Sequence, residues 1–177
     1  KGFDWTDDGQ RLAVWDSSDN LWVWEAGNVV TLPITGTREA RFVDSNHLVL
    51  LVEGNSSAVQ LVSVDGIERE DFPTGDIPFD RIELSTDRSQ LAAASSEGHT
   101  HLYDVASRQK LHEFPVVFTA LAWPDPDLDY SYTAVGVMDG SIHIFSQEDG
   151  AEVMVLRGHK NGEQGRADVL RLKWMLG

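Results

Sequence analysis

The chain has 177 residues, 41% of them hydrophobic, which is enough for one globular domain with its own core. Its 29 acidic and 14 basic residues give a formal charge of −15, which argues against direct nucleic-acid binding and favours protein partners with a basic binding segment. The sequence has no cysteine, no signal-peptide h-region at its start and no apolar run near the roughly 18 residues that cross a membrane. We therefore expect no disulfide, no thiolate metal site and no membrane binding, with a location inside the cell, cytoplasmic or nuclear.

Four segments of the sequence can be superposed with a period near 40 residues, and each predicts a sheet of four short strands. Their predicted limits are about 1–33, 38–73, 79–115 and 117–157 within one domain, 1–177, and 168–175 predicts the first strand of a fifth unit. The ends of the predicted first strands align as Trp5, Phe42, Leu84, Trp123 and Trp174. The ends of the third strands align as Trp24, Val62, Tyr103 and Phe145.

The composition of these segments supports strands. Each run is five to seven residues long, rich in Val, Leu, Ile and aromatics, and bounded by Asp, Asn, Ser, Gly or Pro, which favour turns. The third strands alternate, so that Leu21 and Val23 face one side while Trp22 faces the other. The second strands are almost continuously apolar, as expected for strands that are covered on both faces.

These repeats resemble the blades of the WD-repeat family of β-propellers. Thr6-Asp7-Asp8-Gly9 and Met138-Asp139-Gly140 resemble two turns of that family, Trp24-Glu25 and Tyr103-Asp104 stand where Trp-Asp would, and Leu156-Arg157-Gly158-His159 resembles the start of a repeat. The resemblance implies an all-β propeller of WD-repeat type. We expect this chain to form four four-stranded blades plus the first strand of a fifth, which is a partial or split propeller. No blade keeps all four residues of the family's hydrogen-bonded His, Ser or Thr, Asp and Trp tetrad.

Four blades are fewer than the seven that are usual in the family. An isolated half-ring would expose the apolar flanks of its end blades. The missing blades then come from the rest of a longer chain, from a second copy or from another subunit, unless four blades close alone.

The candidate binding residues lie in an acidic loop and among the tryptophans. Asp125, Asp127 and Asp129 alternate next to Tyr130 and predict an acidic lip for a basic peptide, or only a solvated hairpin. The alternation is similar to the start of a calcium loop, but the glycine and glutamate that such a loop needs are missing. Trp5, Trp123 and Trp174 share one repeat position and are expected in the core. Trp15 and Trp22 lie outside the aligned positions, so each is a candidate anchor for a partner, with packing between blades as the alternative.

No motif predicts catalysis, a metal or a cofactor. His101 and His143 occupy equivalent third-strand positions, but two histidines are fewer than the three or four protein ligands that a zinc ion needs. No nucleophile elbow, phosphate loop or metalloprotease motif is present, so we expect no enzyme. The resemblance favours a scaffold that binds peptides or proteins within a larger complex. The alternatives are a sensor domain of a signalling nucleotide-hydrolysing protein, and a propeller hydrolase or metal-dependent binding module.

Overall fold

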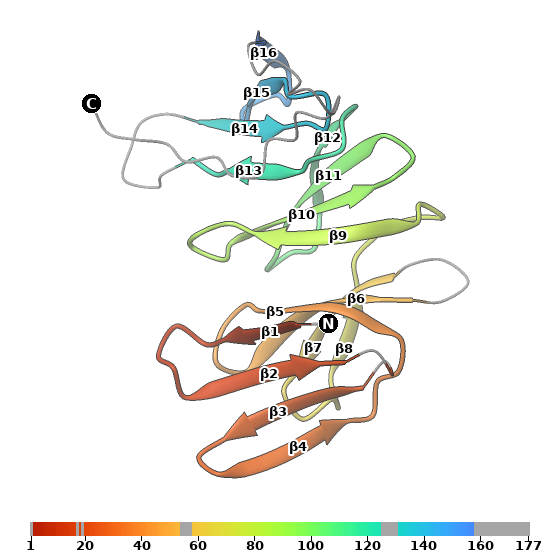
Figure 1. Ribbon diagram of the computed structural model, residues 1–177, viewed down its shortest axis with the longest axis vertical. Coiled ribbons are helices and arrows are strands. Elements are labelled where there is room, and N and C mark those ends of the chain that lie inside the picture. Colours follow the sequence, from red (N-terminus) through yellow and green to blue (C-terminus); the bar gives the residue numbers. More distant parts are fainter. Residues whose placement is uncertain (1, 17, 19, 54–57, 125–130, 158–177) are drawn as a thin grey trace, which may run out of the picture.

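The computed structural model describes residues 2–16, 18, 20–53, 58–124 and 131–157 (Figure 1). These residues form sixteen strands and no helix, and the strands make four antiparallel sheets in which neighbours in the sequence are neighbours in the sheet. None of the described segments is a helix long and apolar enough to span a bilayer. The predicted all-β class and the four four-stranded sheets are confirmed, whereas the predicted fifth-unit strand at 168–175 lies outside the described residues.

Each sheet is one blade of four strands. Blade 1 holds β1 (Gly2–Trp5), β2 (Arg11–Trp15), β3 (Leu21–Glu25) and β4 (Asn28–Leu32). Blade 2 holds β5 (Thr37–Phe42), β6 (His47–Val52), β7 (Ala58–Ser63) and β8 (Arg69–Asp71). Blade 3 holds β9 (Phe79–Leu84), β10 (Gln90–Ser95), β11 (His99–Asp104) and β12 (Lys110–Phe114). Blade 4 holds β13 (Ala120–Ala122), β14 (Tyr132–Gly136), β15 (Ile142–Ser146) and β16 (Glu152–Leu156). Figure 1 shows the blades following one another in chain order along the longest axis.

A hydroxyl and a carboxylate fix the first turn of blades 1 and 3. Thr6 Oγ1 donates to Asp8 Oδ1 over 2.6 Å and accepts the Arg11 backbone N–H over 3.0 Å. Ser85 makes the same two bonds, to Asp87 over 2.7 Å and from the Gln90 N–H over 2.9 Å. Such side-chain bonds replace backbone partners inside a tight turn. The hydrogen bond from Thr6 is the main reason why the pKa of Asp8 lies below its usual value.

Three hydrophobic clusters join the blades in pairs. The first joins blade 1, through Ala13, Trp15, Leu21 and Val23, to blade 2. The second joins the other face of blade 2, including Val49 and Leu51, to blade 3. The third joins the other face of blade 3 to blade 4, and it includes Trp123 and Phe145. Because successive side chains of a strand point to opposite faces, one sheet can take part in two clusters.

Burial along the strands follows this arrangement. Leu48–Leu51 of β6 and Leu91–Ser95 of β10 are buried at every residue, which confirms that these second strands are covered on both faces. In β3, Leu21 and Val23 are buried while Trp22 on the opposite face is partly exposed, as the alternation predicts. The second strand of blade 1 departs from the pattern, since in β2 only Ala13 and Trp15 are buried. Blade 1 is therefore packed on one face only within the part of the chain that the structure describes.

The first strands of successive blades are also joined by polar side chains. Asp4 Oδ2 accepts the backbone N–H of Phe42 in blade 2 over 2.8 Å. Glu39 Oε2 of blade 2 accepts the backbone N–H of Ile82 in blade 3 over 3.0 Å. A carboxylate that accepts a backbone N–H makes a charge-assisted bond, which fixes the relative register of neighbouring blades better than apolar contact alone.

Arg88 connects three blades. It lies in the turn between β9 and β10 with φ at +60°, and its guanidinium donates to the carbonyl of Phe42 in blade 2 and, over 2.5 Å, to Asp7 Oδ1 next to blade 1. Its Nη1 also lies 3.9 Å from Asp4 Oδ2. Because Arg88 is mostly buried, its donors need these partners.

Candidate protein-interaction surface

Blade 1 carries a broad apolar face opposite the one that packs on blade 2. Residues that pair across antiparallel strands project to the same side of the sheet, so the strand register defines this face. We call it the blade-1 face, and its apolar members are Phe3, Trp5, Leu12, Val14, Trp22, Trp24 and Val29.

The aromatic members of this face are well exposed. Phe3 is 67% exposed, Trp5 42% and Trp24 37%, and the Trp5 and Trp24 rings form an edge-to-face pair with centroids 6.2 Å apart. At about 150–250 Å² for a whole aromatic side chain, these three alone expose roughly 300 Å². That area, to which Val29 adds, already reaches the size of the largest apolar patch on a typical monomer, and such patches mark interaction sites.

The same repeat positions are completely buried in blade 2. Trp5 pairs with Leu12, which pairs with Trp24, just as Phe42 pairs with Leu48, which pairs with Val62. Those three residues of blade 2 have no exposed surface, because blade 1 covers them. The blade-1 face is therefore the type of face that, elsewhere in this chain, packs against another blade.

The expectation that Trp5 lies in the core is wrong. Its repeat equivalent Trp123 is 8% exposed and packs in the cluster between blades 3 and 4, as expected for that position. Trp5 occupies the same position in blade 1, but no described residue of another blade covers it. A repeat position thus becomes core only when a neighbouring blade is present. The third member of the set, Trp174, lies outside the described residues.

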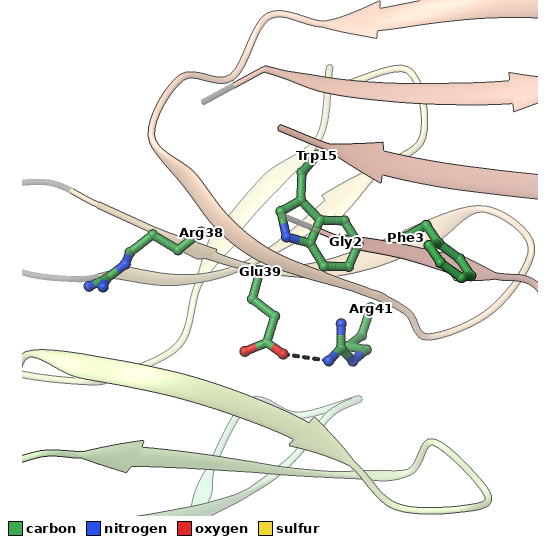
Figure 2. Close-up of a pocket in the computed structure, with 6 residues that line it drawn as sticks. All are labelled: Gly2, Phe3, Trp15, Arg38, Glu39 and Arg41. Carbon is green, nitrogen blue, oxygen red and sulfur yellow. Dashed lines mark hydrogen bonds and ion pairs between the residues drawn. The ribbon is translucent and has the colours of Figure 1, made fainter. Parts of the chain in front are cut away.

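A cavity of about 310 Å³ opens beside the blade-1 face, between blades 1 and 2. Figure 2 shows the residues that line it, which are Gly2, Phe3, Trp15, Arg38, Glu39 and Arg41. The guanidinium of Arg41 lies 5.6 Å from the centre of the Trp15 ring and also bonds to Glu39. Gly2 is needed here, because a Cβ at this position would lie 2.7 Å from the Trp15 ring.

The charges in this cavity largely cancel. Arg41 pairs with Glu39, and Arg38 Nη1 lies 3.7 Å from Asp80 Oδ1. Within the described residues, no group of three or more His, Cys, Asp or Glu side chains is arranged to hold a metal ion. The cavity thus offers a planar apolar wall and exchangeable arginine donors, a combination suited to a side chain of a bound segment.

The predicted anchors Trp15 and Trp22 lie on opposite faces of blade 1. Trp15 is 5% exposed and packs in the cluster with blade 2, where it also forms the wall of the cavity. Trp22 lies on the blade-1 face and is partly exposed. Asp125, Asp127, Asp129 and Tyr130 lie outside the described residues, as does the Gly158-His159 pair, so the acidic lip stays a prediction.

The two equivalent histidines pack between blades, each near a glutamate of the fourth strand. His101 Nδ1 lies 3.0 Å from the hydroxyl of Tyr103, and its Nε2 lies 3.2 Å from Glu113. Burial is the main reason why the pKa of His101 is lowered and that of Tyr103 is raised. Both side chains therefore stay uncharged within the blade 2–blade 3 packing at neutral pH.

In blade 4, Ser141, His143 and Glu152 have the connectivity of a catalytic triad. Ser141 Oγ lies 2.9 Å from His143 Nε2, and His143 Nδ1 lies 2.6 Å from Glu152 Oε2. However, Ser141 is buried and donates its one hydroxyl proton to Asp139 over 2.5 Å. The hydroxyl can then only accept from His143, so the imidazole cannot act as its base. The geometry is that of a hydrogen-bonded turn.

No protein-family model matches the sequence. The structure is similar to the crystal structure of the C-terminal WD40 domain of Sif2, with a TM-score of 0.66 and 16% sequence identity over 87% of this chain. The matched region is 45% of that domain, so the chain spans less than half of its length. At this identity the likeness establishes the fold alone, and together with the four sequential sheets it shows that the chain has the fold of a partial WD40 propeller.

Proposed function

We propose that this chain is a protein–protein interaction scaffold and that the blade-1 face is its principal binding surface. The observation that carries the proposal is the exposure of Phe3, Trp5 and Trp24 at repeat positions whose equivalents in blade 2 are buried under blade 1. WD40-like folds commonly mediate protein interactions, and tryptophan is enriched among residues that dominate binding energies.

An apolar protein surface would fill the blade-1 face. A basic segment of a protein partner would meet the acidic surface of this chain, whose formal charge is −15, outside the blade-1 face. The acidic loop with Asp125, Asp127 and Asp129 stays part of this proposal, as does a cytoplasmic or nuclear location.

Retention of partners from an extract of the source cells tests this proposal. The immobilised chain is compared with Phe3→Arg and Val29→Arg, which place a charge on two opposite edges of the blade-1 face. Ile67→Arg is the matched control, because Ile67 is 79% exposed, more than any other large hydrophobic residue that the structure describes, and lies in the turn between β7 and β8. We expect the same proteins to be retained by the unchanged chain and by Ile67→Arg but lost from both face variants. Equal retention of the same proteins by the unchanged chain and by all three variants would contradict the proposal.

A further inference from the structure

The two end blades expose opposite types of face. The blade-1 face corresponds to the side of blade 2 that receives blade 1, as the burial of Phe42, Leu48 and Val62 shows. The side of blade 4 that is turned away from blade 3 has no described blade packed on it, and it corresponds to the side of blade 1 that packs on blade 2. It carries Ala134, Ile142, Ile144, Met154 and Leu156, which the strand register puts on one side of the sheet.

The matching positions agree in size and polarity. Leu21 pairs with Leu32 in blade 1, where Ile142 pairs with Leu156 in blade 4. Two residues further along the third strand, Val23 pairs with Ala13 in blade 1 and Ile144 pairs with Ala134 in blade 4. In blade 1 these four residues are buried by blade 2, whereas in blade 4 Leu156 is 47% and its neighbour Met154 52% exposed.

We propose that the blade-1 face binds blade 4 of a second copy of this chain, so that two copies, with four described blades each, join head to tail into a closed ring. This inference rests on the proposed role of the blade-1 face in binding and names its occupant. The contact would repeat the packing already present three times within the chain, with an aromatic and aliphatic face against a face of small and aliphatic residues. Head-to-tail contacts require two different, complementary faces, and they close into a ring when the rotation per unit allows it.

A closed ring removes the exposed apolar faces of blades 1 and 4, whose side chains would otherwise stay in water.

The test is the mass of the purified chain by light scattering behind size-exclusion chromatography, over a hundred-fold range of concentration. One copy has a mass of 19.7 kDa, so the proposal predicts a mass near twice that value at the higher concentrations. Val29→Arg on the blade-1 face and Met154→Arg on blade 4 should each bring the mass down to 19.7 kDa, whereas Ile67→Arg should leave the dimer intact. Far-UV circular dichroism with an unchanged spectrum identifies the variants that are folded. Phe3→Arg and Leu156→Arg provide a second variant for each face.

A mixing experiment distinguishes a head-to-tail ring from a dimer that is held by two blade-1 faces. An equimolar mixture of Val29→Arg and Met154→Arg restores one unchanged interface, from blade 4 of the first variant to blade 1 of the second. We expect native mass spectrometry to detect the mixed dimer at concentrations where neither variant dimerises alone. A dimer that Met154→Arg leaves intact would be held by two blade-1 faces and would overturn the ring. A folded chain that stays at 19.7 kDa throughout would overturn self-association. If that monomer still loses its cellular partners on Val29→Arg, the scaffold function survives and only the second copy fails.

Discussion

Replacing Trp123 by alanine tests the packing between blades 3 and 4. This side chain is 8% exposed and packs in a cluster with Leu121, Val135 and Phe145. A tryptophan that removes roughly 200 Å² of apolar surface from water contributes about 5 kcal/mol at 25 cal/mol per Å², and residual burial in the unfolded chain lowers that figure. We therefore expect a loss of about 3–5 kcal/mol in the free energy of unfolding, in line with aromatic truncations in other cores.

The assay is urea unfolding followed by far-UV circular dichroism. With a slope of about 2–3 kcal/mol per molar urea, the midpoint should fall by roughly 1–2 M. Ile67→Ala is the control. Because Ile67 is exposed, this change should alter the free energy of unfolding by less than about 0.5 kcal/mol. Trp123→Phe is a milder variant, whose smaller loss stays measurable if the alanine variant is close to unfolding. A change below about 1 kcal/mol for Trp123→Ala would refute the assignment of Trp123 to an interblade core.

Other predictions concern charged residues. Arg88→Ala should lower the free energy of unfolding by about 1–3 kcal/mol in the same urea assay, because Arg88 bonds to two other blades. Arg108 is the control, since it has the same φ of about +60° but forms an exposed pair with Glu70. Arg108→Ala should therefore lower the free energy of unfolding by less than about 1 kcal/mol. Burial raises the pKa of Glu83 above its usual value, so the charged form is disfavoured in the folded state. Glu83→Gln should therefore raise the urea midpoint at pH 7, where Glu83 would carry a charge, and not at pH 4. A lower urea midpoint of this variant at pH 7 would contradict this reasoning. Hydrogen bonds, led by those from Thr6 and Ser107, lower the pKa of Asp8 and Asp104. The stability that these two carboxylates contribute should therefore be complete above about pH 4 and should be lost as the pH falls through their lowered pKa values. A thermal unfolding temperature that does not fall between pH 5 and pH 2 would refute this prediction.

Much of the fold could be predicted from local sequence. The period near 40 residues, the turn residues such as Asp8-Gly9, and the alternation in β3 together predict four four-stranded sheets, and the structure has them. These signals are local, because a hairpin depends on residues close together in the chain. The equivalence of Trp24, Val62, Tyr103 and Phe145 also agrees with the register, since each pairs with the same position of a second strand.

The burial of particular tryptophans could not be predicted in the same way. Trp5 and Trp123 share a repeat position, yet one is exposed and the other is buried, because only the second faces another blade. A repeat pattern shows which face of a strand can pack, and not whether a neighbour is there. The blade-1 face is therefore predictable as the apolar flank of an end blade, but the sequence predicts one member, Trp5, in the core and another, Trp22, as a partner anchor.

Some side-chain contacts could not be predicted from the sequence at all. Arg88 reaches Asp7, 81 residues earlier in the chain, and His143 links Ser141 to Glu152 of the next strand. Neither contact has a motif, because each depends on the angle between packed sheets or on strand register. Spacing alone would have missed the triad-like connectivity of Ser141, and only its bond to Asp139 shows that the hydroxyl proton is already donated.

Hydroxyl-radical footprinting of the tryptophans tests whether the blade-1 face is exposed while the interblade clusters are buried, because it measures the exposure of each side chain in solution. In the monomer, obtained by dilution or with Met154→Arg, we expect rapid oxidation of Trp5 and Trp24 and strong protection of Trp15 and Trp123. At concentrations where two copies associate, Trp5 and Trp24 should become protected as well. Oxidation of Trp123 as fast as that of Trp24 in the folded monomer would contradict both the interblade packing and the exposed blade-1 face.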